Sequence, residues 1–90
     1  MNIRVLYFAS LRAHLGCAQE QLEISAQDFT QNPPSLSALA DYLQKRGSDY
    51  QQAFAERTRI RVAINQEYAS WDDSIKDKDE IAFFPPVTGG

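Results

Sequence analysis

The residues best suited to take part in chemistry lie at the end of the chain, where Phe83-Phe84 leads into Pro85-Pro86-Val87-Thr88-Gly89-Gly90. Proline cannot donate to a β-ladder, and two prolines favour the stiff polyproline II conformation. The residues beyond carry no charged side chain, and the last two have no side chain at all, so they fit a narrow slot. We therefore expect the α-carboxylate of Gly90 to be the functional group.

The simpler alternative is that this end frays and that its two glycines are accidental. At full extension the four residues after Pro86 reach roughly 13 Å. Three features favour a functional tail: the absence of charge, the stiff Pro-Pro spacer that follows the strand over residues 80–84, and the lack of a side chain on the last two residues.

Two pairs of adjacent aromatic residues indicate a binding surface. Tyr7-Phe8 and Phe83-Phe84 each fall in a predicted strand, where neighbouring side chains point to opposite faces. A helix can cover only one face, so one member of each pair must be exposed or covered by a partner. Tyr7 and Phe83 share the spacing of the apolar core positions, which places Phe8 and Phe84 on the uncovered face. Ordinary core packing is the alternative.

Other reactive side chains have simpler explanations. His14 and Cys17 could act as base and nucleophile, but no third group that would orient them is evident, so we expect incidental solvent-side residues. Arg12 is expected to be a surface charge, the alternative being a contact near the tail with an anionic partner. Lys45 and Arg46 fit the last turn of a helix, where positive charge is favoured.

An acidic stretch late in the chain could resemble a metal-binding loop. Its aspartates are Asp72, Asp73, Asp77 and Asp79. The stretch lacks the glycine and the closing glutamate of an EF-hand loop, so we predict solvated turns and no bound metal.

Hydrophobic patterning predicts the elements that must position these residues. Strands are expected over 3–8, 19–24, 60–64, 67–69 and 80–84, with short helices from the N-cap Ser10 to Gly16 and over 49–56. The main helix begins at the N-cap Ser35, presents one apolar stripe, and ends at Gly47. This order predicts an α+β fold in which the helix packs across one face of a mixed sheet. The first and last strands are the most apolar and should lie side by side in its middle.

Composition narrows the class of protein. With 90 residues, 43% of them hydrophobic and 23% charged, the chain suits a single small globular domain rather than a disordered or coiled-coil protein. The net charge of -3 argues against nucleic-acid binding, and one cysteine favours a reducing compartment. No signal peptide and no bilayer-spanning apolar run is evident, so we expect a cytoplasmic protein without membrane contact.

The chain resembles the family of small, sulfur-carrier subunits of molybdopterin synthase, which are ubiquitin-like β-grasp proteins. The resemblance covers essentially all 90 residues and rests on three segments, which are Arg4–Arg12, Ala63-Ile64-Asn65-Gln66 and, above all, Asp79–Gly90. Gly-Gly alone would be a weak sign, because ubiquitin and the thiamine-pathway sulfur carrier also end that way. The resemblance implies one β-grasp domain over 1–90, with its first and last strands parallel and an extended tail over 85–90.

The family's chemistry implies a role for the tail. An ATP-dependent, ubiquitin-activating-like enzyme converts the terminal carboxylate to a glycyl adenylate, and sulfur from a persulfide donor then leaves a thiocarboxylate on Gly90. The large synthase subunit, with which the family forms a heterotetramer, takes up the tail, and the sulfur passes to cyclic pyranopterin monophosphate. The chain would then be a sulfur-donating subunit rather than a catalyst, with no bound cofactor; ATP is used by the activating partner.

The resemblance also assigns a docking surface. Positions matching Phe8, Tyr68 and Phe84 contribute in the family to the apolar surface that meets both partners. Two other interpretations stay open: a sulfur carrier for another pathway, such as thiamine or tRNA thiolation, and a ubiquitin-like interaction module with an unmodified tail.

Overall fold

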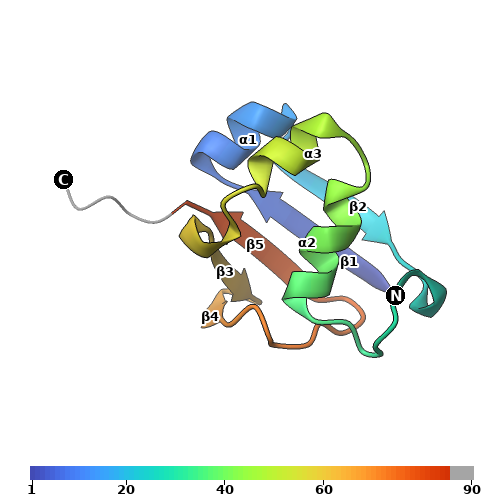
Figure 1. Ribbon diagram of the computed structural model, residues 1–90. Helices are drawn as coiled ribbons and strands as arrows, with labels where there is room; N and C mark the ends of the chain where they lie inside the picture. The colour runs from blue at the N-terminus through green and yellow to red at the C-terminus, as the bar shows by residue number, and fades with distance from the viewer. Residues whose placement is uncertain (86–90) are drawn as a thin grey trace.

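A computed structural model, which describes residues 1–85, shows a five-stranded mixed sheet with helices across one face (Figure 1). The strands are β1 (Asn2–Tyr7), β2 (Gln19–Glu23), β3 (Arg61–Ile64), β4 (Glu67–Ala69) and β5 (Glu80–Phe84). Their order is β2-β1-β5-β3-β4, with β1 and β5 parallel and every other neighbouring pair antiparallel. The predicted α+β class and the central pairing of the first and last strands are confirmed.

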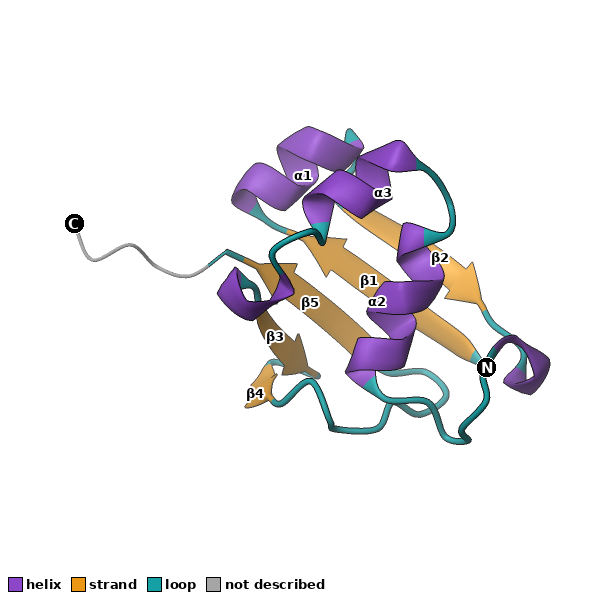
Figure 2. Cartoon of the chain, viewed as in Figure 1, coloured by secondary structure: helices purple, strands orange, loops and turns teal. Residues whose placement is uncertain are grey.

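The helices lie on one side of this sheet (Figure 2). They are α1 (Ala9–Leu15), α2 (Leu36–Gln44) and α3 (Ser48–Ala53), with short 3₁₀ turns η1 (Ala26–Asp28) and η2 (Arg57–Arg59). None of the helices in this part of the chain is long and apolar enough to cross a membrane.

Side chains of alternate strand residues form the core beneath the helices. The fully covered positions include Ile3 and Val5 of β1, Ile81 and Phe83 of β5, and Leu36, Leu39 and Leu43 of α2, each at 0% exposure. Burying one such side chain contributes about 1.5–3 kcal/mol, so this single layer supplies most of the driving force for folding.

Phe83 lies at the centre of an aromatic cluster near the end of β5. Its ring stacks on Trp71 at 5.8 Å and on Tyr7 at 6.4 Å, and meets Phe54 edge to face at 5.0 Å between ring centroids. Aromatic pairs in such geometries add about 0.5–1.5 kcal/mol beyond burial. The end of β5 is therefore packed against three other aromatic side chains.

Two predicted helix ends differ from the structure. Ser35 caps α2 as expected, its Oγ accepting the Ala38 N–H at 3.1 Å, whereas α1 begins at Ala9 and has no side-chain cap, so Ser10 was wrongly assigned. The helix α2 stops at Gln44, so placing Lys45 and Arg46 in its last turn was also wrong. Arg46 instead pairs with Glu20 at 3.0 Å, because a charge-assisted hydrogen bond outweighs the weaker helix-dipole effect.

The Glu20 carboxylate joins three separate elements. It accepts the hydroxyl of Tyr7 at 2.7 Å and that of Tyr50 at 2.8 Å, besides the Arg46 guanidinium, which also lies 5.0 Å above the Tyr50 ring. Burial by itself would raise the pKa of Glu20, but these donors outweigh it and the pKa is lowered. Burial and the hydrogen bond to the Glu20 carboxylate raise the pKa of Tyr50 to about 12.

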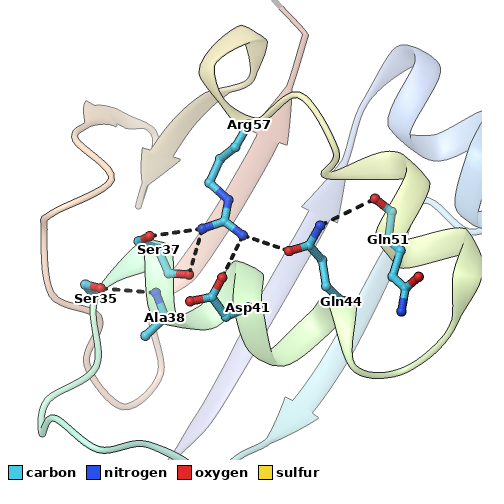
Figure 3. A network of polar contacts seen from close by, with 7 residues as sticks. All are labelled: Ser35, Ser37, Ala38, Asp41, Gln44, Gln51 and Arg57. Carbon is cyan, nitrogen blue, oxygen red and sulfur yellow. Dashed lines mark hydrogen bonds and ion pairs between the residues drawn. The ribbon is translucent and has the colours of Figure 1, made fainter.

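Arg57 fastens η2 to α2 (Figure 3). Its guanidinium donates to Ser37 Oγ at 3.0 Å, Asp41 Oδ1 at 2.8 Å and Gln44 Oε1 at 2.9 Å. It also lies 5.6 Å above the ring of Trp71. The turn that leads into β3 is therefore fixed against the main helix and, through Trp71, against the aromatic core.

The Glu20 contacts predict a pH-dependent stability. A carboxyl whose pKa is lower in the folded than in the unfolded protein contributes stability at any pH above its unfolded pKa of about 4.5. This contribution is lost as the pH falls from that value through the folded pKa. Glu20→Gln should therefore destabilise by about 1–3 kcal/mol at pH 7 and flatten this acid limb. Urea denaturation from pH 3 to pH 7 measures both effects. Glu23→Gln, an exposed position of the same strand, is the matched control; equal behaviour of the two variants would contradict the assignment.

Candidate functional site

The three aromatic residues predicted to form a docking surface lie together on the face of the sheet opposite the helices. Phe84 meets Phe8 edge to face at 6.3 Å and Tyr68 at 5.8 Å between ring centroids. Phe8 is 45% exposed, Tyr68 is 80% exposed and Phe84 is half-buried. Tyr7 and Phe83, which precede Phe8 and Phe84 in the chain, are buried. The split of each aromatic pair between the two faces is confirmed; a role in binding partners stays a prediction.

These rings border a concavity of about 510 Å³, which we call the aromatic hollow. It is lined by Leu6, Phe8, Ala63, Gln66, Tyr68, Glu80, Ala82 and Phe84. Ala63 and Ala82 pair across β3 and β5, and their small side chains leave a floor between the larger rings. Sequence analysis did not assign these two alanines, although strand alternation from Phe84 would have placed Ala82 on this face.

The β3–β4 hairpin positions Tyr68. Its turn residues Asn65 and Gln66 have φ values of 52° and 72°, the left-handed pair that a type I′ turn requires. The Asn65 amide donates to Asp79 Oδ1 at 3.0 Å and accepts the Glu80 N–H at 2.9 Å, which ties the hairpin to the start of β5. This side chain was missed as a positioning residue; its occurrence in a two-residue turn was the available signal.

Phe8 is held where β1 ends. Its N–H donates to the Phe83 carbonyl at 3.1 Å, extending the parallel pairing by one residue. Ala9 follows with a φ of 51°, a conformation uncommon for a residue with a Cβ, and turns the chain directly into α1. The ring of Phe8 is thus fixed beside Phe84, at the end of the sheet from which the tail departs.

Pro85 is the last described residue of the predicted tail. It borders a groove of about 290 Å³, which we call the tail-base groove, formed mainly by residues of α1 and α3 and by the segment through η2. Its lining is Ser10, Leu11, His14, Gln52, Ala53, Ala55, Glu56, Arg59, Ile60 and Pro85. The other tail residues assigned from the sequence, Pro86, Val87, Thr88, Gly89 and Gly90, lie outside the described part of the chain.

The remaining candidates form no second reactive centre in the described residues. His14 and Arg12 are exposed, as expected, but Cys17 is half-buried and packs against the core. Burial and the nearby Glu20 charge raise the pKa of the Cys17 thiol, which disfavours the nucleophilic thiolate.

The acidic stretch is built as turns, with one correction. Asp72, Asp73 and Asp77 are exposed as predicted, but Asp79 is buried, and its carboxylate accepts Asn65 Nδ2 and the Lys76 N–H at 2.8 Å. Folding buries Asp79 because these donors satisfy its oxygens. Within residues 1–85 there is no group of three or more His, Cys, Asp or Glu side chains arranged to hold a metal ion.

The mixed sheet, with its parallel central strands and its helices across one face, defines a ubiquitin-like β-grasp fold. Comparison with solved structures agrees: small archaeal modifier protein 1 from Haloferax volcanii superposes with a TM-score of 0.71 at 21% identity, over 96% of this chain and 98% of that one. A complex of subunits 1 and 2 of molybdopterin-converting factor from Helicobacter pylori contains a chain that superposes with a TM-score of 0.63 at 20% identity, over 100% of both chains. At these identities the likeness shows the fold alone.

The family follows from the sequence. Residues 5–90 match the ThiS family, to which the chain belongs. It is 39% identical to the molybdopterin synthase sulfur carrier subunit of Haemophilus influenzae and 38% identical to that of Escherichia coli K12, in each case over 98% of this chain and 99% of the relative.

The two faces of β5 predict losses of stability of different size when a charge is introduced. Phe84→Lys should lower the unfolding free energy by less than about 1 kcal/mol, because the new ammonium group can reach solvent. Phe83→Lys, one residue earlier, should cost about 3 kcal/mol or more, because it removes a fully covered ring and buries a charge. Chemical denaturation of both variants measures the difference, and similar losses would contradict the assignment of faces.

Proposed function

We propose that this chain is the sulfur carrier subunit of molybdopterin synthase. The observation that carries the proposal is identity of 38–39% with two relatives of that name over nearly the whole length of both chains. The uncharged Gly89-Gly90 ending supports it, because the proposed reaction takes place at the terminal carboxylate.

The proposed chemistry overcomes the low electrophilicity of a carboxylate. The Gly90 carboxylate attacks the α-phosphorus of ATP in an adenylating enzyme, which forms an acyl-adenylate and releases pyrophosphate. The outer sulfur of a persulfide donor then displaces AMP and forms an acyl disulfide. A thiol on the donor side cleaves the S–S bond of this intermediate, which leaves a thiocarboxylate on Gly90 and a disulfide on the donor. The thiocarboxylate sulfur then attacks cyclic pyranopterin monophosphate in the large subunit. In this proposal the chain supplies the nucleophile on an arm, while its partners bind ATP and supply acids, bases and phosphate-binding groups.

The aromatic hollow is the proposed docking surface for the adenylating enzyme and for the large subunit, which would form a heterotetramer with this chain. Exposed aromatic rings in a well-formed concavity are typical of residues that dominate binding energy. Phe84 joins this surface directly to Pro85, so a partner seated on the hollow lies at the start of the tail.

The terminal carboxylate provides the direct test. Deleting Gly90 withdraws the acyl carbon by roughly 3.5 Å of extended chain, and adding one residue places an inert amide at its position. A misplacement of 1 Å can lower a rate on the order of 100-fold, so both variants should fail to form thiocarboxylate while their melting temperatures stay unchanged. Intact mass after incubation with ATP, adenylating enzyme and sulfur donor detects the exchange of oxygen for sulfur.

Cys17→Ser is the matched control for this experiment, because Cys17 is the one cysteine of the chain. This variant must retain full sulfur loading if Gly90 is the acceptor. Normal loading of the truncated or extended chain would reject the proposal in favour of an interaction module. Loading that occurs without transfer to the pterin in the large subunit would instead indicate a carrier for another pathway.

Docking is tested separately. Phe84→Lys should weaken binding to the large subunit and to the adenylating enzyme by about 2 kcal/mol or more, because the charge would be desolvated at the centre of the interface. Gln21→Lys introduces the same charge on the same face of the sheet, at an exposed position outside the hollow, and should leave affinity unchanged. Isothermal titration calorimetry compares the two; equal affinities would place the interface elsewhere.

A further inference from the structure

Two arginines lie near the point where the chain leaves the sheet, one towards each face of the sheet. Arg61 pairs in register with Phe84, so its side chain belongs to the face that carries the aromatic hollow. Arg59 lies in η2 and lines the tail-base groove together with Pro85.

Both arginines remain available for an external partner. The Arg59 side chain is 68% exposed, and its ion pair with Glu56 is long, at 3.5 Å, between two exposed groups. Arg61 is exposed and has no ion-pair partner within residues 1–85. By contrast, Arg46 and Arg57 form short pairs at 3.0 and 2.8 Å with Glu20 and Asp41.

The backbones of both residues are held in place. Arg61 is the first residue of β3, and Arg59 is two residues from Arg57, whose guanidinium is bonded to α2 in several directions (Figure 3). A charge on a fixed backbone loses less conformational freedom on binding than one on a mobile loop. The two cations therefore form a preorganised feature beside the tail.

We propose that Arg59 and Arg61 form a cationic rim that binds an acidic segment of the partner that takes up the tail. This inference rests on the proposed function and names the chemistry of the partner surface at the same site. Interfaces commonly surround an apolar centre with a polar rim, and arginine is enriched in them. The rim adjoins the aromatic hollow through Phe84, so one partner surface can cover both.

An acidic protein surface fits these observations better than a polyanion such as a nucleic acid. The chain as a whole has a net charge of -3, which repels an extended polyanion beyond the immediate rim. Glu56 in the tail-base groove further limits the positive region to the surroundings of the two arginines. A partner protein with a few carboxylates beside an apolar contact surface would match a positive region as small as these two arginines.

Charge reversal tests the rim. The double variant Arg59→Glu/Arg61→Glu should associate with the cognate large subunit about 10-fold more slowly than the unaltered chain in 50 mM salt, with a smaller change in dissociation rate. The deficit should shrink in 500 mM salt, where screening acts within a few ångströms. Stopped-flow fluorescence gives both rates, and Arg59→Gln/Arg61→Gln should fall between the two proteins.

Lys45→Glu/Lys76→Glu is the matched control, since it makes the same change in net charge at exposed positions outside the tail-base groove and the aromatic hollow. It should associate at a nearly normal rate, and thermal melts check that all variants fold. If the control variant associates equally slowly, the slowing is an effect of net charge and the cationic rim is rejected. If the Arg59→Glu/Arg61→Glu variant associates faster than the unaltered chain, the partner surface is not acidic. Normal binding by the reversed variant rejects the rim alone, whereas no binding by the unaltered chain rejects the proposed function as well.

Discussion

The parallel pairing of β1 with β5 is the constraint on which the rest of the structure depends. Both strands lie in the middle of the sheet, and both carry large apolar side chains on both faces. Because successive side chains of a strand point to opposite faces, this pairing separates Tyr7 from Phe8 and Phe83 from Phe84. One ring of each pair enters the core, and the other lies on the opposite face of the sheet.

This separation explains how a small chain can have a stable core and also keep aromatic side chains on its surface. The helices pack across one face, and Phe83 contacts Tyr7, Phe54 and Trp71 within the core that they cover. The other face keeps an aromatic hollow with two alanines as its floor, and no helix of residues 1–85 covers it (Figure 1). Since β5 ends at this hollow, the rigidity of the core extends to the start of the tail.

Charged residues serve two different purposes in this arrangement. Glu20 and Arg57 gather short hydrogen bonds and ion pairs that hold α3 and η2 in place, and such charge-assisted contacts are stronger than exposed pairs. Arg59 and Arg61 lack comparable partners in the described chain. Both are exposed to solvent, one towards each face of the sheet. The internal pairs fix the backbone that carries the external charges, so the residues that stabilise this region differ from those proposed to bind a partner.

The sequence by itself determined the strands, the main helix with its Ser35 cap, the central pairing and the opposite faces of the aromatic pairs, because these follow from periodicity and local capping. Its family resemblance also named Phe8, Tyr68 and Phe84. Only the tertiary structure decided that their rings touch, that Asn65 ties the hairpin to β5, that Asp79 is buried, and that Arg46 leaves the helix end for Glu20. These outcomes depend on contacts between residues 14 to 76 positions apart. At such separations a side chain has several possible partners of similar interaction energy, and the local sequence does not indicate which of them it will contact.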